Sequence, residues 1–254
     1  MSRFEKYSES FRHVGLERRD GVLKIAIHHE GGPAKMSSYP GGLHEELGDV
    51  FYEVGRDSDN KVVIFTGTGD VFMTEFDRSV PNEDRFTPLG RDRIYKHGKD
   101  LLKNLLEIEA PVIGAVNGPA LVHPELLTLS DLVIASDRAS FHDGHVPRGL
   151  VPGDGATVWW TMLLGPNRGR QFLMTGEEIG AAEAKQLGFV AEIVPHDQLL
   201  DRAWEIAFEL AAKPQMMLRY MRVCFTQHIR RRMLDDLGHG LSLQNVAALA
   251  AFQK

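Results

Sequence analysis

The sequence from Asn117 to Gly155, NGPALVHPELLTLSDLVIASDRASFHDGHVPRGLVPGDG, decides the fold. A short apolar run, PVIGAV at 111–116, leads into it and is typical of a strand covered on both faces. After the turn signal NGP, the composition is helical at 120–129, and a second apolar run follows at 131–135. These pieces predict a short βαβ unit. The Gly/Pro-rich segment 141–155 is then expected to be a loop carried by that scaffold.

Apolar strands and amphipathic helices also alternate on both sides of this unit. Strands are expected at 21–28, 61–66 and 189–194. The spacing of apolar residues predicts helices at 42–54, 91–108, 156–164, 167–174, 181–187, 198–212, 214–232 and 237–252. This order of strands and helices indicates an α/β fold.

The chain of 254 residues is long enough for one large domain or two small ones. We expect a core over residues 1–195 and a helical C-terminal region over 196–254. The apolar residues of LSLQNVAALAAF at 241–252 suit a helix that covers a partner subunit. They suit packing against their own subunit equally well.

Composition excludes several classes of partner. The formal charge of -6 and the pI near 6.0 give no general attraction to a phosphate backbone, so no nucleic acid is expected. No window approaches the roughly 18 apolar residues of a membrane span, and the polar start MSRFEKYSES lacks a signal core. We therefore expect a cytoplasmic protein with no membrane partner. The single cysteine, Cys224, excludes an internal disulfide and is expected in the core, because its surroundings have an apolar helical pattern.

Five motifs resemble the crotonase (enoyl-CoA hydratase/isomerase) superfamily and occur in its order. They are KVVIFTGTGDVF at 61–72, PVIGAVNGPAL at 111–121, SDLVIASDRASF at 130–141, GLVPGDGA at 149–156 and MTGEEIGAAEAKQLGFVAEIVP at 174–195. The resemblance implies a crotonase-like α/β fold, in which a spiral core of ββα turns is closed by a C-terminal helical trimerisation region. It also implies a homotrimer or a dimer of trimers.

The sequence departs from the hydratase pattern at both catalytic glutamates of that family. Glu125 aligns with the first, but His123 and Pro124 replace the glycines before it and one residue is missing. Proline also lacks an N–H. His145 stands at the place of the second glutamate. The carboxylate pair that acts on water in hydratases is therefore broken.

A different set of residues resembles the carbon–carbon hydrolase branch of the superfamily, the β-diketone hydrolases typified by 6-oxocamphor hydrolase. The set consists of His44, His123, His145 and Asp154. Tyr39 stands at an aromatic pocket position of that branch, and Gln244 stands where the branch carries a glutamate. The resemblance implies a hydrolase without a cofactor. Its substrate would be a small cyclic or bicyclic β-diketone, cleaved at a C–C bond (retro-Claisen) to a keto acid.

These residue types suit that chemistry. Water must attack a carbonyl, an oxyanion must be stabilised, and an enolate must leave. We assign proton transfer to His145, with Asp154 orienting its ring, a contribution worth roughly 10² to 10⁴ in rate. Family position places the oxyanion donors at the backbone N–H groups of Phe76 and His123, and one such donor is worth about 2.7 to 4 kcal/mol. His44 is a candidate for positioning the water.

Each of these residues also has a purely structural explanation. His145 could tie down its Gly-rich loop, and Asp154 could cap the helix that follows it. His44 lies beside an apolar face, where a core histidine is common. Histidine ligands of zinc usually stand at short regular spacing on one helix, a pattern that this sequence lacks, so we expect no metal.

Two other functions stay open. One is an enoyl-CoA hydratase or isomerase that acts on a CoA thioester through Glu125. The other is a non-catalytic crotonase-fold binding protein. The broken glycine segment argues against the first, because a thioester carbonyl needs close backbone approach there. The His145 and Asp154 pair argues against the second.

Overall fold

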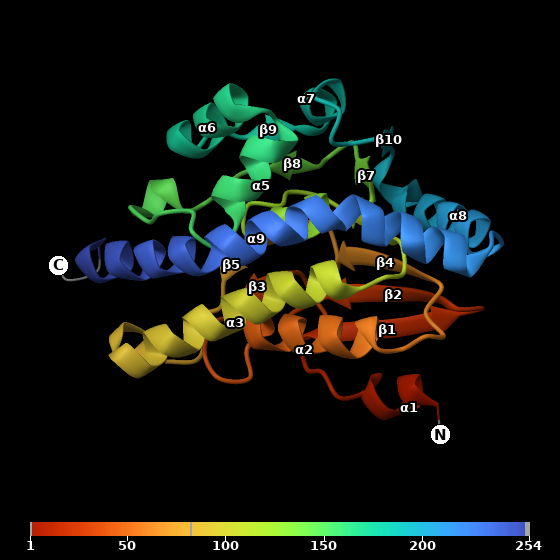
Figure 1. Cartoon of the computed structure of the whole chain (residues 1–254), viewed down its shortest axis with the longest axis horizontal. Coiled ribbons are helices and arrows are strands. Elements are labelled where there is room, and N and C mark those ends of the chain that lie inside the picture. Colours follow the sequence, from red (N-terminus) through yellow and green to blue (C-terminus); the bar gives the residue numbers. More distant parts are fainter. Residues whose placement is uncertain (1, 82, 252–254) are drawn as a thin grey trace.

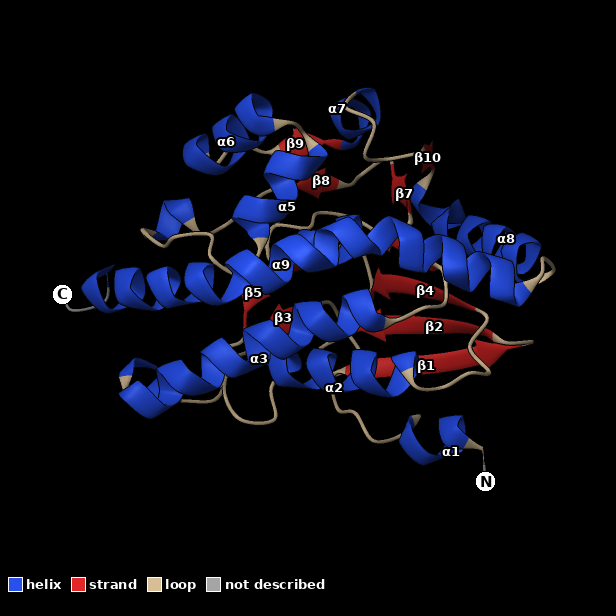
Figure 2. Cartoon of the chain, in the orientation of Figure 1, coloured by secondary structure: helices blue, strands red, loops and turns tan. Residues whose placement is uncertain are grey.

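A six-stranded sheet forms the centre of the computed structural model, which describes residues 2–81 and 83–251 (Figures 1 and 2). In spatial order its strands are β1 (Val14–Arg19), β2 (Val22–Ile27), β4 (Val62–Gly67), β6 (Val112–Val116), β7 (Leu132–Ser136) and β10 (Glu192–Val194). Only β1 is antiparallel to its neighbour. The central strands β4 and β6 are buried along their whole length, as their unbroken apolar sequence predicts.

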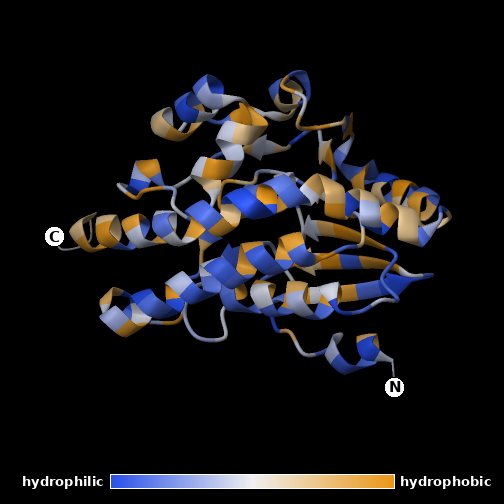
Figure 3. Ribbon diagram, viewed as in Figure 1, coloured by the Kyte–Doolittle hydropathy of each residue, from blue (hydrophilic) through white to orange (hydrophobic). Residues whose placement is uncertain are grey.

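Helices connect the parallel strands and cover the sheet. They are α1 (Arg3–Tyr7), α2 (Leu43–Gly55), α3 (Pro88–Glu107), α4 (Glu125–Thr128), α5 (Ala156–Leu163), α6 (Pro166–Thr175), α7 (Ala181–Gln186), α8 (Leu199–Ala211) and α9 (Gln215–Ala251). Three 3₁₀ turns accompany them: η1 (Glu83–Phe86), η2 (Val146–Arg148) and η3 (His196–Gln198). Figure 3 shows apolar residues along β2 and β4 and polar residues on the outer helices. The described helices include none long and apolar enough to cross a bilayer.

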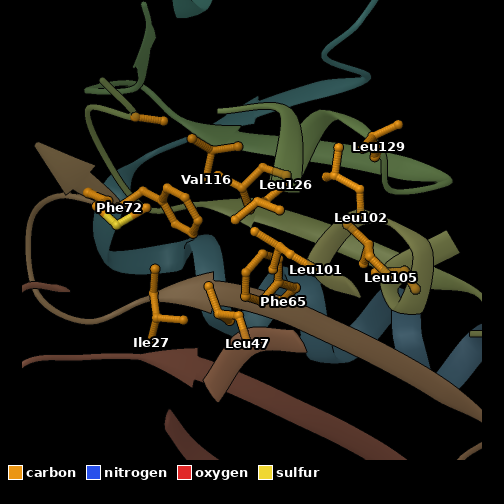
Figure 4. Close-up of a cluster of buried hydrophobic side chains, with 14 of the residues drawn as sticks. Ile27, Leu47, Phe65, Phe72, Leu101, Leu102, Leu105, Val116, Leu126 and Leu129 are labelled. Carbon is orange, nitrogen blue, oxygen red and sulfur yellow. The ribbon is translucent and has the colours of Figure 1, made fainter. Parts of the chain in front are cut away.

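The core occupies both faces of the sheet. On one face, Phe65, Phe72 and Leu101 belong to a large cluster of buried side chains beneath α2 and α3 (Figure 4). On the other face, α8 packs on β2, β4, β6 and β7 through Leu199, Ala203 and Ala207. The first helix of the C-terminal region is thus part of the core packing.

A second, smaller layer of strands carries the loops of the candidate site. Strand β3 (Ala34–Met36) pairs in parallel with β5 (Met73–Phe76), and β8 (Ser140–Phe141) pairs with β9 (Ile179–Gly180). Ala120 joins the two pairs, because it makes one bridge to Met73 and another to Phe141. Two layers of strands arranged in this way give the crotonase-like α/β fold that the motifs predict.

The prediction of a helix at 120–129 was wrong for its first half. Only α4 is helical there, because Ala120 pairs as a strand residue and His123 has a left-handed φ of 51°. The helix begins directly after Pro124, which lacks the N–H that a helix interior requires. The other strands and helices of the central block lie close to their predicted positions.

The C-terminal predictions also needed correction. Helices expected at 214–232 and 237–252 are one continuous helix, α9, and residue 252 lies outside the described residues. Cys224 is exposed in this chain and is not a core residue. Its helix buries the stripe that contains Leu218, Arg222 and Thr226, and Cys224 falls beside that stripe. Strand β10 is shorter than the predicted 189–194, and β1 was not predicted.

Candidate active site

A cavity of about 650 Å³ opens between α3, α9 and the loops of the small strand layer. In Figure 1 the first turns of α3 and the last turns of α9 extend beyond the main sheet on the same side. Ile94 of α3 and Leu241 and Ala248 of α9 supply apolar walls to this cavity. Most polar residues of the predicted site come from the loops where the short strands end, and Gln244 comes from α9.

The small strand layer brings the predicted site residues together. Tyr39 and His44 follow β3, Phe76 ends β5, His123 follows the Ala120 bridge, and His145 follows β8. Neighbouring strand segments end near one another, so side chains distant in sequence meet at this edge. All seven predicted residues line the cavity, namely Tyr39, His44, Phe76, His123, His145, Asp154 and Gln244.

His145 is clamped between two buried aspartates. Its Nε2 lies 3.1 Å from Oδ2 of Asp154, as the predicted dyad requires. Its Nδ1 lies 3.0 Å from Oδ1 of Asp143, and the same oxygen accepts the His145 backbone N–H at 3.1 Å. Asp143 and Asp154 are 1% and 4% exposed. The orienting position at Nδ1 therefore belongs to Asp143, and Asp154 occupies the side of the ring that faces the cavity.

The protonation of this cluster follows from its charges. Burial alone would lower the pKa of His145, but Asp154 and Asp143 outweigh burial and raise that pKa well above its ordinary value. Burial alone would raise the pKa of Asp154, but the neighbouring His145 and His123 hold it well below its usual range. At neutral pH the resting pair is therefore an imidazolium beside a carboxylate, and the neutral, basic form of His145 is the minor one.

Substitution of Asp143 should move the pH profile of any reaction that uses neutral His145 as a base. The rate should rise with pH through the raised pKa of His145 and level off above it. Asp143→Asn removes one of the two carboxylates that raise this pKa, so the midpoint should shift to lower pH. The measurement is kcat/KM against pH for both proteins. An unchanged midpoint would remove Asp143 from the proton-transfer unit.

His123 forms a second pair with a buried acid. Its Nδ1 lies 2.5 Å from Oε1 of Glu125 and 3.6 Å from Oδ2 of Asp154. Burial alone would lower the pKa of His123, but the contact with Glu125 outweighs burial, so this pKa is raised overall. The left-handed backbone is strained for a residue with a side chain, and within the described residues no acceptor takes up the His123 N–H. A backbone donor left free at a strained position beside a cavity suits an oxyanion, as predicted.

His44 is buried and neutral. Burial, reinforced by His123 and His97, lowers its pKa to about 3. Its ring lies 5.5 Å from the ring of His123, and its Nδ1 has no hydrogen-bond partner among the described residues. An uncharged imidazole with an open nitrogen can bind water or a carbonyl oxygen without adding charge.

Asp154 does not cap the helix that follows it, which was the structural explanation for this residue. Gly155 is the N-cap of α5, and no side chain caps that helix. Across the described chain, neither carboxylate oxygen of Asp154 has an aligned hydrogen-bond donor, although both are buried. The loop that carries Asp154 packs closely against α9. A Cβ on Gly153 would lie 2.0 Å from the carbonyl oxygen of Gly240, so only glycine allows this contact. Asp154 is thus fixed in place with its acceptors open to the cavity.

Three predicted residues lie at the edge of this cluster. Gln244 Nε2 lies 3.2 Å from Nε2 of His145, so the amide can donate to that ring only when His145 is neutral. Tyr39 donates to Oδ2 of Asp77 at 2.7 Å and is held away from the histidines. The Phe76 ring lies 4.1 Å below the guanidinium of Arg148 and forms part of the cavity wall.

Comparisons with known proteins agree with this geometry. The family model for enoyl-CoA hydratase/isomerase matches residues 17–245. The chain belongs to the enoyl-CoA hydratase/isomerase family. The short-chain-enoyl-CoA hydratase of Clostridium acetobutylicum is 30% identical over 236 residues, which cover 92% of this chain and 87% of the relative. The 4-chlorobenzoyl coenzyme A dehalogenase-1 of Arthrobacter sp is 28% identical over 212 residues, which cover 82% and 75% of the two chains.

One solved structure is more similar than these relatives. It is a β-diketone hydrolase from the cyanobacterium Anabaena sp. PCC 7120, bound to (S)-3-oxocyclohexyl acetic acid. It is 40% identical to this chain, with a TM-score of 0.91 over 98% of both chains. The chain therefore has the enoyl-CoA hydratase/isomerase fold, and the names of its relatives cover more than one class of substrate.

Two acids that contact the site histidines, Glu125 and Asp143, were not predicted as site residues. Glu125, which the sequence resemblance places at a hydratase glutamate, forms a hydrogen bond with His123. Asp143 stands two residues before His145, a spacing that lets one carboxylate meet both the backbone and the ring. The motif Asp-Gly-His at 143–145 could have indicated the role of Asp143, because an aspartate side chain often accepts the backbone N–H of the residue two positions later.

The acids and histidines also raise the question of a metal ion. Of the residues described, His123, Glu125 and Asp154 bring three potential ligand atoms within 4.8 Å of one another. Nδ1 of His123 and Oε1 of Glu125 are 2.5 Å apart, within reach of a charge-assisted hydrogen bond. Ligands around zinc stand roughly 3.3 Å apart, given metal–ligand bonds of about 2.0 to 2.1 Å. The arrangement is that of a proton-bearing pair.

Proposed function

We propose that this protein hydrolyses a C–C bond of a cyclic or bicyclic β-diketone to give a keto acid, without a cofactor. The observation that carries the proposal is the clamp on His145, whose Nε2 faces Asp154 at 3.1 Å inside the cavity. This clamp stands where a hydratase of the same family has a catalytic glutamate. The 40% identity to a β-diketone hydrolase supports the same assignment.

The proposed reaction begins with water held by Asp154 and His44. Neutral His145 takes a proton from the water as its oxygen bonds to one carbonyl carbon. The resulting oxyanion is stabilised by the His123 N–H and by the His123 ring, with the Phe76 backbone N–H as the second expected donor. The C–C bond then breaks and its electron pair forms an enolate. His145 returns the proton to the enolate carbon, and the new carboxylic acid ionises.

A paired assay tests the proposal. Loss of ultraviolet absorbance from an enolisable bicyclic 1,3-diketone is followed beside hydration of a short enoyl-CoA, with each product identified by mass. The proposal expects a diketone product heavier by one water and an unchanged thioester. Thioester hydration without diketone cleavage would refute it.

A CoA-thioester hydratase or isomerase is the second candidate, because Glu125 keeps a hydratase position and burial raises its pKa. The variant Glu125→Gln tests the role of Glu125 in the diketone hydrolase. In the diketone hydrolase, Glu125 only holds His123, so kcat should fall about 10- to 100-fold, the worth of one charge-assisted hydrogen bond. The check is kcat on the diketone beside that of wild type. If kcat on the diketone is the same in Glu125→Gln and wild type, Glu125 does not position His123 for the reaction.

A further inference from the structure

Two arginines line the same cavity without an acidic partner. Arg91 is in the first turns of α3, and Arg148 ends η2. Within the described residues, no carboxylate lies within 4.0 Å of either guanidinium. Elsewhere, partly or fully buried arginines do have acids, as in Arg18–Asp57, Arg168–Glu183 and Arg222–Asp131. Arg91 is therefore a cation of the cavity that no acid among the described residues contacts, whereas the charge of Asp143 acts on Arg148 from a greater distance.

The surroundings of Arg91 do not favour its positive charge, so the residue is not explained by a contribution to stability. A cation near the start of a helix opposes the helix dipole. Its Nε is buried and has no acceptor among the residues described. Its guanidinium lies 5.1 Å from the Phe86 ring, which also carries the guanidinium of Arg85 at 4.5 Å. Burial, with Arg85 adding to it, lowers the pKa of Arg91. An anion in the cavity would relieve the repulsion between Arg91 and Arg85.

Arg148 occupies a prepared position beside the reacting residues. A Cβ on Gly144 would lie 2.6 Å from Nη2 of Arg148, so the glycine leaves room for this guanidinium next to the His145 backbone. The Phe76 ring supports the guanidinium from the other side at 4.1 Å. The cavity thus has a guanidinium beside His145 even though the chain as a whole is negative.

We propose that the substrate of this cavity carries a carboxylate away from its reacting carbonyl, held by Arg91, with Arg148 as the second cation of the same cavity. The diketone part of this substrate rests on the proposed function. A carboxylate accepts two parallel N–H bonds from one guanidinium, which a neutral diketone cannot do. Hydrolysis of such a substrate gives a dicarboxylate, because the second acid forms at the attacked carbonyl.

The test uses a product-like ligand that cannot react, so that it does not depend on turnover. Calorimetry compares 3-oxocyclohexyl acetic acid bearing a second carboxymethyl group with its methyl ester at that second group. Wild type should bind the acid at least about tenfold more tightly than the ester, the factor expected of a charged hydrogen bond. Arg91→Met should abolish this preference, and Arg91→Lys should keep part of it. Arg170→Met, at an exposed arginine outside the cavity, is the control and should behave as wild type.

Equal affinity for acid and ester in wild type, or an unchanged preference in Arg91→Met, would overturn the proposal. Tighter binding of CoA than of the keto diacid, lost in Arg91→Met, would also overturn it, because Arg91 would then belong to a pyrophosphate site. The proposed function fails separately: if the carboxylate preference holds but no diketone is cleaved, the anion site stands and the hydrolase assignment falls.

Discussion

His145→Ala should lower kcat on a bicyclic 1,3-diketone by at least about a hundredfold, because a positioned proton-transfer group is worth roughly 10² to 10⁴ in rate. The loss should appear in kcat more than in KM, since His145 acts on the water in the transition state. The substitution should leave the protein folded, because the loop is also held by Gly153 against α9. Steady-state kinetics with circular dichroism of both proteins provides the measurement.

His142→Ala is the matched control for this substitution. His142 lies in the same loop, and its Nδ1 is 3.4 Å from the carbonyl oxygen of Glu177, outside the cavity. It should retain wild-type kcat. If His145→Ala is as active as His142→Ala, the histidine serves loop architecture and the hydrolase mechanism loses its base.

The fold could be predicted because its determinants are local. Unbroken apolar runs such as 62–67 and 112–116 are buried on both faces, so their sequence carries the signal of a central strand. The continuity of α9 across residues 233–236 could not be predicted in this way. Gly240 lies where α9 touches the backbone of Gly153, and a Cβ there would lie 2.4 Å from the Gly153 carbonyl oxygen. Tertiary contact overrides propensity at this point.

The residues of the candidate site were predicted, but their pairing was not. Asp154 was expected to orient His145, and the structure shows that Asp143 holds the ring at Nδ1 while Asp154 faces Nε2. A sequence shows which residue types are present but not on which side of an imidazole each acid lies. The same holds for Glu125, whose partner could be known only once His123 had been placed by its left-handed backbone.

The contacts between histidines and acids explain why the site suits one protonation state. His44 is neutral, whereas His123 contacts Glu125 and His145 contacts Asp143. Asp154 lies between the rings of His123 and His145. A glutamate at position 244 would place a further carboxylate beside His145 and raise its pKa more. Gln244 instead offers an amide to the neutral ring. The chain thereby keeps the basic form of His145 more accessible than a third acid would allow.

Asp154→Asn should reduce kcat on the diketone by about 10² to 10⁴, because it removes the carboxylate shared by both histidines. Oδ2 of Asp154 lies 3.1 Å from Nε2 of His145 and 3.6 Å from Nδ1 of His123. Without that charge the burial of His145 is opposed by Asp143 alone, so its pKa should fall. An amide is also a weaker acceptor for the attacking water. The rate should therefore stay low even where His145 is fully neutral, and kcat against pH measures this directly.

Asp57→Asn separates the catalytic effect from the general effect of removing a buried acid. Asp57 is 5% exposed and accepts from Arg18 and Tyr7, far from the cavity. Breaking that pair leaves a charge without its partner, so it should lower the free energy of unfolding by about 3 to 5 kcal/mol while kcat is retained. Asp154→Asn should instead lower kcat while the free energy of unfolding changes little. Its carboxylate caps no helix and has no aligned donor among the described residues. If Asp154→Asn unfolds more readily but its folded fraction keeps the wild-type kcat, Asp154 is a structural residue and the attacking water must be held by other groups.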